Sequence, residues 1–177
     1  MAEIFNYPSF IKYIQHDNSV NIRYVRKSKT QEATGKRVDL LQKMMDHLRA
    51  KSLCRKVFVS PSSNANDPLI QRDEKLKPSM QATLQRLRHI NGDCQDLITE
   101  LQTARSPLRL IVQDFTGLST VQDDIRLLVE KCKNHEIVVD NGYRMDSFSR
   151  ASILNDNGDV LQRFVTCRKA PLRRSQL

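Results

Sequence analysis

The chain is organised around residues 78–104, PSMQATLQRLRHINGDCQDLITELQTA. Apolar or small side chains recur here at alternating steps of four and three, the a and d spacing of a heptad repeat. The pattern predicts one helix, which ends before Pro107 because the residue before a proline is pushed out of the helical conformation. The repeat positions are Met80, Leu84, Leu87, Asn91, Cys94, Ile98 and Leu101.

Two interpretations of this helix stay open. It is either one helix of an intermolecular coiled coil, in which the polar Asn91 sets the register, or a helix packed inside a bundle of the same chain. Gly92 argues against a long rigid coil. We expect its apolar side to bind a protein partner or a second copy through Met80, Leu84, Leu87, Asn91, Ile98 and Leu101.

The segments after residue 104 predict two more helices and then strands. Pro107 suits the first turn of a helix through LRLIVQDF, and Ser119 with Gln122 forms a capping box for a helix to about residue 134. From residue 137 the apolar period shortens to two. The pair Asn157-Gly158 then predicts the turn of a β-hairpin within residues 151–167.

The N-terminal third alternates short helices and strands. We expect a helix at 8–16, a strand at 20–25, a helix at 31–52 and a strand at 56–60. Residues 60–77 are rich in Ser, Asn, Pro and charge, and such a long irregular stretch is either mobile or functional.

The expected fold class is α+β. It comprises an N-terminal βα element, a central three-helix segment with the heptad-like helix, and a small C-terminal antiparallel β-hairpin sheet. The expected domains are a basic βα segment (1–60), a linker or mobile loop (61–77), a helical segment with the C-terminal sheet (78–168) and a disordered basic tail (169–177). If the N-terminal strands join the C-terminal sheet, the first and third units form one domain.

Positive charge gathers in the first third of the chain. The net charge is +9, and residues 1–60 hold 12 Lys or Arg against 5 Asp or Glu. A concentrated basic region attracts polyanions, whereas a merely solvated basic face is the competing interpretation. The expected contacts to nucleic acid are Arg23, Tyr24, Arg26, Lys27, Lys29, Lys36 and Arg37.

The common catalytic and cofactor signatures are absent from the sequence. Its five glycines form neither a dinucleotide-binding nor a Walker loop. His89 with Cys94 and Cys132 with His135 have the ligand types of a zinc site, but the first pair points about 140° apart on a helix. We therefore name no catalytic, metal or cofactor-binding residue and expect no cofactor.

The sequence predicts a non-catalytic intracellular interaction protein, either nuclear or cytoplasmic. It contains no apolar run of the ~18 residues needed to span a bilayer, no signal peptide and no C-x-x-C pair among its four cysteines. The expected role is an adaptor or complex subunit that binds a protein through the apolar helical surface. The alternatives are a nucleic-acid-binding or chromatin-associated protein that uses the basic region, and an enzyme with an unrecognised site.

Overall fold

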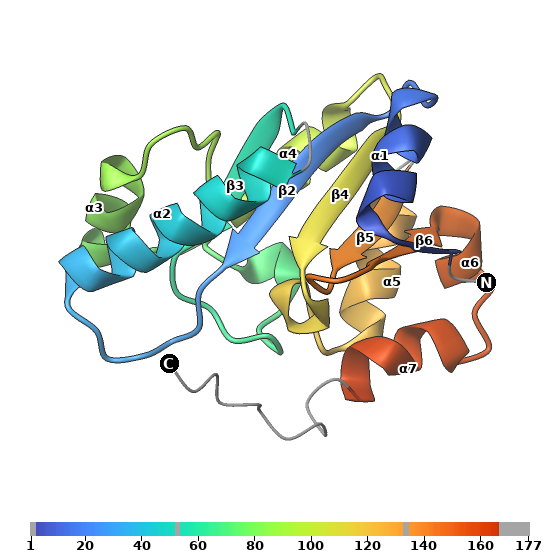
Figure 1. The fold of residues 1–177 in the computed structure, drawn as a ribbon. Helices are drawn as coiled ribbons and strands as arrows, with labels where there is room; N and C mark the ends of the chain where they lie inside the picture. Colours follow the sequence, from blue (N-terminus) through green and yellow to red (C-terminus); the bar gives the residue numbers. More distant parts are fainter. Residues whose placement is uncertain (1–2, 52–53, 133–134, 167–177) are drawn as a thin grey trace.

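A mixed β-sheet runs through the centre of the molecule (Figure 1). The computed structural model describes residues 3–51, 54–132 and 135–166. Within them, six strands pair in the order β1-β6-β5-β4-β2-β3. The parallel strands are β2 (Val20–Arg26), β3 (Lys56–Ser60), β4 (Leu108–Gln113) and β5 (His135–Asp140). At one side β6 (Met145–Ser149) is antiparallel to β5, and β1 (Glu3–Phe5) is antiparallel to β6.

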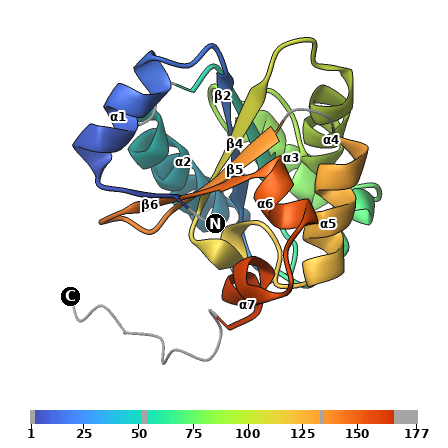
Figure 2. The same cartoon turned by 90° about the vertical axis from the view of Figure 1, so that its right-hand side faces the viewer.

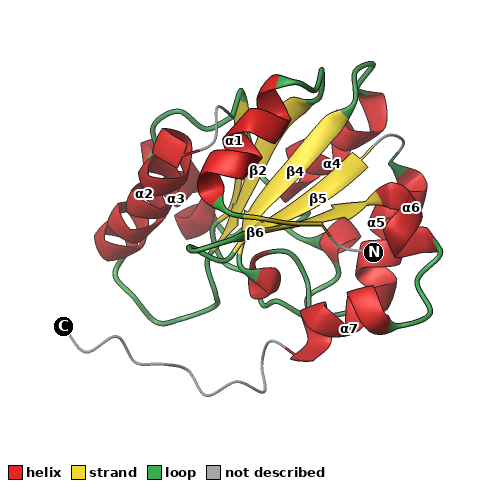
Figure 3. Ribbon diagram, turned by 45° about the vertical axis from the view of Figure 1, so that its right-hand side comes forward, coloured by secondary structure: helices red, strands yellow, loops and turns green. Residues whose placement is uncertain are grey.

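Helices cover both faces of this sheet, as Figures 2 and 3 show. One face is covered by α1 (Tyr7–Gln15) and α2 (Thr34–Lys51), and α3 (Pro78–Arg86) lies beside α2. The opposite face is covered by α4 (Cys94–Thr103), α5 (Gln122–Lys131) and α6 (Arg150–Leu154), with α7 (Asp159–Thr166) against α5. Two 3₁₀ turns, η1 (Leu69–Gln71) and η2 (Phe115–Gly117), complete the described elements. No helix in the described residues is long and apolar enough to cross a membrane.

The segment LRLIVQ forms the central strand β4, so the helix predicted there is wrong. Leu110 and Val112 pack in the core shared with α4 and α5, whereas Ile111 packs against α1 on the opposite face. A parallel strand that is buried on both faces is apolar at nearly every position and lacks the alternation of a half-exposed strand. A short apolar run of this kind cannot be told from a buried helix by its period.

The continuous helix predicted over 78–104 is also wrong, because the chain breaks it into α3 and α4. Between them Asn91 lies along the outer edge of β3: its amide donates to the Val57 carbonyl at 2.7 Å, and its Oδ1 accepts from the Val57 amide at 2.9 Å. Gly92 has φ +147°, and a Cβ there would lie 2.0 Å from the Asp96 carboxylate. Asp93 and Asp96 then form a capping box that starts α4.

The hairpin predicted around Asn157-Gly158 is replaced by the helices α6 and α7. Gly158 does take a positive φ of 115°, but it lies in the turn between the two helices. The Asp156 carboxylate accepts hydrogen bonds from the amides of Val160 and Leu161 at 2.9 Å, which satisfies the first turn of α7. Positive φ at an Asn-Gly pair therefore does not by itself distinguish a hairpin from a helix–helix turn.

The expected fold class is corrected accordingly. Instead of a small C-terminal hairpin sheet, one mostly parallel sheet takes strands from both halves of the chain, and β1, β2 and β3 all come from residues 1–60. The helices expected at 8–16 and 31–52 are confirmed. The helix expected at 119–134 forms as α5, but the capping box predicted for it is wrong, because α5 begins at Gln122 after Val121 and has no side-chain cap. The strands expected at 20–25, 56–60 and 137–139 are confirmed as well. The whole tail predicted to be disordered, 169–177, lies outside the described residues.

Candidate functional site

The parallel strands end together at one edge of the sheet, and the strand order reverses there between β2 and β4. Open α/β sheets bind ligands at such a carboxyl edge. Here Arg26, the last residue of β2, bridges the neighbouring loops. Its Nε and Nη2 donate to the Thr116 carbonyl at 3.1 and 2.9 Å, and its Nη1 donates to the Ser63 carbonyl. The guanidinium of Arg26 thus fills the place between β2 and β4 where the strand order reverses, and the open space lies on the β3 side.

That open space is a crevice between the β2–α2 loop (27–33) and the segment after β3 (61–77). It consists of an inner cavity of about 420 Å³ and an outer cavity of about 600 Å³. Both cavities are lined by Lys29, Ser62 and Lys75, so they adjoin. Their volumes fall within the range of small-molecule sites.

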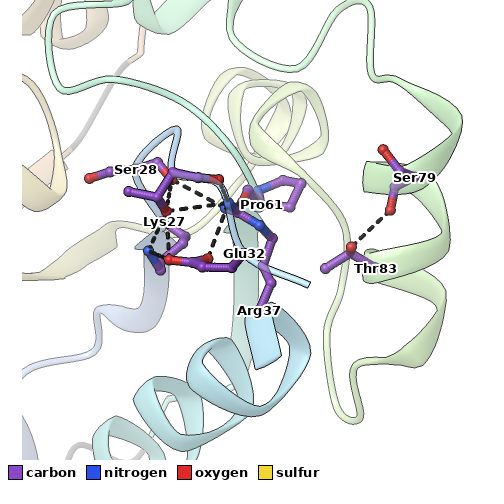
Figure 4. A network of polar contacts seen from close by, with 8 residues as sticks. Lys27, Ser28, Glu32, Arg37, Pro61, Ser79 and Thr83 are labelled. Atoms are coloured by element: carbon purple, nitrogen blue, oxygen red, sulfur yellow. Dashed lines mark hydrogen bonds and ion pairs between the residues drawn. The ribbon is translucent and has the colours of Figure 1, made fainter. Parts of the chain in front are cut away.

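Arg37, in the first turns of α2, organises one wall of the crevice (Figure 4). Its side chain is only 2% exposed. Nη1 donates to the carbonyls of Pro61 at 2.7 Å and Ser28 at 3.2 Å, and Nη2 donates to the Thr30 carbonyl at 2.6 Å. Because Pro61 follows β3 and the other two carbonyls belong to the β2–α2 loop, this one guanidinium ties the loop to the edge of the sheet.

A second set of contacts fixes the same loop from within. Lys27 Nζ donates to Glu32 Oε1 at 2.7 Å, and Glu32 Oε2 lies 3.1 Å from Arg37 Nη2 (Figure 4). The hydrogen bond from Lys27, together with one from Thr30, holds the pKa of Glu32 below its ordinary value. Lys27 and Arg37 are therefore committed to an internal carboxylate and arrange the loop rather than meet a ligand.

Other cations around the outer cavity are available. Lys75 and Lys77 are exposed, and neither has an ion-pair partner within the described part of the chain. Lys77 is the N-cap residue of α3 and provides no side-chain cap. Pro78 has no N–H and the amides of Met80 and Gln81 donate to the Lys77 carbonyl, so the Ser79 amide is the one left to face the rim. Such an N-terminus attracts negative charge. The outer cavity is therefore an electropositive pocket.

Lys29 spans the crevice. Its Nζ lies 2.7 Å from Asp67 Oδ2, although its side chain is 53% exposed. Burial opposes ionisation of Asp67, but Lys29 and the Asn64 amide together hold its pKa below the ordinary value. An anion in the crevice has to compete with Asp67 for this ammonium group.

Arg72 closes the inner end and is 3% exposed. Nη1 donates to the Tyr24 hydroxyl at 3.0 Å and the Leu118 carbonyl at 2.8 Å, and Nη2 donates to the Asp67 carbonyl at 2.8 Å. Its Nε is buried and has no hydrogen-bond partner among the described residues. Arg72 lines the inner cavity, but less than 1 Å² of its Nε is accessible, so this donor is covered by the protein and does not face a ligand there.

Asp73 forms the adjoining wall with a left-handed backbone, φ 67°. Its carboxylate accepts from the Ser60 hydroxyl at 2.9 Å and from the Cys94 amide at 3.1 Å. A further 2.9 Å hydrogen bond joins the hydroxyls of Ser60 and Ser63. Burial raises the pKa of Asp73 to about 6, against the effect of these hydrogen bonds. Asp73 thus connects the 61–77 segment to β3 and to the start of α4.

The predicted nucleic-acid residues are divided between the interior and the surface. Arg23 and Tyr24 are buried in β2, and Arg37 is buried as described. Arg26 and Lys27 are half-buried, whereas Lys29 and Lys36 are exposed. Of the seven, Lys29, Lys27 and Arg37 lie at or next to the crevice, and contact with nucleic acid stays a prediction for the set: Arg23, Tyr24, Arg26, Lys27, Lys29, Lys36 and Arg37.

The predicted partner-binding residues do not lie on one helix face. Leu87, Ile98 and Leu101 are buried in the core, and Ile98 and Leu101 lie in a different cluster from Leu87. Met80 and Leu84 are half-buried on α3, and Asn91 is exposed at the edge of β3. A partner cannot reach them as a single apolar surface. Lys75, Lys77, Arg72 and Asp73 were not predicted as site residues, although they lie in the 60–77 stretch that was expected to be mobile or functional.

A second polar cluster lies at the opposite, amino edge of the sheet, beside a cavity of about 440 Å³. The fully buried Arg109 forms ion pairs with Asp17 and Glu136, and its Nη1 donates to Asn21 Oδ1 at 2.9 Å. The Tyr13 hydroxyl donates to Glu136 at 3.0 Å. All donor nitrogens of this guanidinium have protein acceptors, so the cluster ties α1 to the sheet. In the described residues no group of three or more His, Cys, Asp or Glu is placed to hold a metal ion.

Comparison with known proteins identifies no relative of the chain. No protein-family model matches the chain, and no curated protein or solved structure is significantly similar to it.

Proposed function

We propose that this protein binds a small phosphorylated ligand in the crevice at the carboxyl edge of its sheet. The observation that carries the proposal is the pair Lys75 and Lys77, which lack ion-pair partners in the described residues, beside the uncapped N-terminus of α3. Ammonium groups and free helix N–H groups together are the usual donors to phosphate. The loop held by Arg37 supports the proposal, because a preformed wall lowers the entropy lost on binding.

Calorimetric titration of the full chain with inorganic phosphate and pyrophosphate tests this proposal. Lys75→Met or Lys77→Met should weaken binding about tenfold, since each removes one charge-assisted contact of about 1.5 kcal/mol. The matched control is Lys131→Met, because Lys131 is an exposed lysine on α5 that does not line the crevice. Equal affinity in all three variants, or no binding by the unmodified chain, would refute the proposal.

Nucleic-acid binding is the competing proposal, and the exposure of Lys29 and Lys36 near the same edge supports it. The two functions differ in their salt dependence. Nucleic-acid binding falls steeply with salt, in proportion to the number of phosphates contacted, whereas one or two phosphates in a crevice give a shallow slope. Lys36 does not line the crevice. Lys36→Met should therefore weaken oligonucleotide binding but leave pyrophosphate binding unchanged.

A further inference from the structure

The two halves of the crevice differ in charge. Among the described residues, the outer cavity is lined by four cationic side chains and the carboxylate of Glu32, which is already paired. The inner cavity has three cations and three carboxylates and is neutral in formal charge. Its charged lining residues are Lys29, Arg72, Lys75, Asp67, Asp73 and Glu74.

A neutral wall that is dense in donors and acceptors suits hydroxyl groups. The carboxylates accept hydrogen bonds, and the side-chain amide of Gln71 offers both kinds of contact. An ammonium group on the ligand meets no net negative charge here, because the three carboxylates are matched in number by three cations and Asp67 is already paired with Lys29. A hydroxyl group both donates and accepts, so it matches this lining better.

The lining also argues against recognition of a nucleobase. Its apolar residues are Pro68, Leu76 and Met80, and none of the residues lining either cavity is aromatic. Bases are commonly held by stacking on aromatic side chains. The crevice thus has a place for phosphate and a place for hydroxyls, but no stacking platform.

We propose that the ligand is a sugar phosphate, with its phosphate in the outer cavity and its hydroxyls against Asp73 and Glu74 in the inner cavity. This inference rests on the proposed function and specifies its ligand class. The fold decides which cavity takes the phosphate of the ligand and which takes its hydroxyls. The free lysines and the start of α3 lie at the outer end, and Asp73 is hydrogen-bonded to Ser60 at the end of β3.

Titration of the full chain at pH 7.5 with ribose 5-phosphate, inorganic phosphate, free ribose and adenosine monophosphate tests the inference. Asp73 is ionised at this pH, above its pKa of about 6. Ribose 5-phosphate should bind at least about tenfold more tightly than inorganic phosphate, since two or three hydrogen bonds to carboxylates are added. Adenosine monophosphate should bind no more tightly than ribose 5-phosphate.

The variants locate the added contacts. Glu74→Gln and Asp73→Asn should cut the preference for ribose 5-phosphate over inorganic phosphate to about threefold or less. Glu74 is exposed, so Glu74→Gln keeps the test valid if a variant at the half-buried Asp73 fails to fold. Glu130→Gln, an exposed carboxylate on α5, is the control.

The outcomes separate the two proposals. Phosphate binding without a preference for the sugar phosphate, or with a preference that both carboxylate variants retain, overturns the sugar-phosphate inference and leaves phosphate binding in place. Tighter binding of adenosine monophosphate than of ribose 5-phosphate also overturns it. If neither ribose 5-phosphate nor inorganic phosphate binds, the proposed function itself fails.

Discussion

Arg37→Met should detach the β2–α2 loop from the edge of the sheet. The substitution keeps much of the side-chain volume but removes the donors to three backbone carbonyls. A hydrogen bond from a charged group contributes about 1.5–3 kcal/mol. Ser28 and Thr30 are exposed and their carbonyls can bind water instead, whereas Pro61 is buried and its carbonyl is left unsatisfied. We therefore expect a loss of about 3 kcal/mol rather than the sum of three bonds.

Urea unfolding followed by far-ultraviolet circular dichroism measures this loss, since the chain lacks Trp. Arg37→Lys should lose less, because it keeps the charge but not the planar fork that reaches several carbonyls. Lys36→Met, an exposed neighbour on the same helix, should stay within about 0.5 kcal/mol of the unmodified chain. Binding of pyrophosphate should weaken in Arg37→Met under conditions where the variant is folded. A stability loss below about 0.5 kcal/mol with unchanged binding would refute the role assigned to Arg37.

Three further predictions follow from individual residues. Burial raises the pKa of Asp73 from 3.8 to about 6, so protonation of this group stabilises the folded protein below pH 3.8, and that stability is lost as the pH rises through 6. Asp73→Asn should remove this pH dependence of the free energy of unfolding, measured with urea. If the variant keeps the same pH dependence, the prediction is wrong. Asp67→Asn should strengthen pyrophosphate binding several-fold by calorimetry because it releases Lys29, and weaker binding would show that the ion pair holds the site open. Gly92→Ala should lower the free energy of unfolding by about 2–3 kcal/mol in the same assay, since the residue has φ +147° and the new Cβ meets the Asp96 side chain. Gly35→Ala is the control: nothing lies near its Cβ, so it should change stability little.

The candidate site was only partly predictable from the sequence. The concentration of basic residues near β2 indicates Lys29 and Arg37. It does not distinguish a side chain that contacts a ligand from one that holds the loop in place. Arg37 donates hydrogen bonds to carbonyls that follow β2 and β3, and these bonds form only because the two strands lie side by side. Lys75 and Lys77 lie in a stretch interpreted as a linker, and they gain a common role only where the chain returns to the carboxyl edge.

By itself the sequence determined the elements whose signals are local. Pro8 lies in the first turn of α1, and the alternating β-branched run at 20–25 forms β2. Only the tertiary structure decided that the apolar run at 108–113 is a central strand and that Asn91 lies along the edge of β3, between two helices, rather than inside one. The physical reason is that burial on both faces removes the alternation that reports a strand, and that edge pairing with β3 offers Asn91 hydrogen bonds as good as those of a helix.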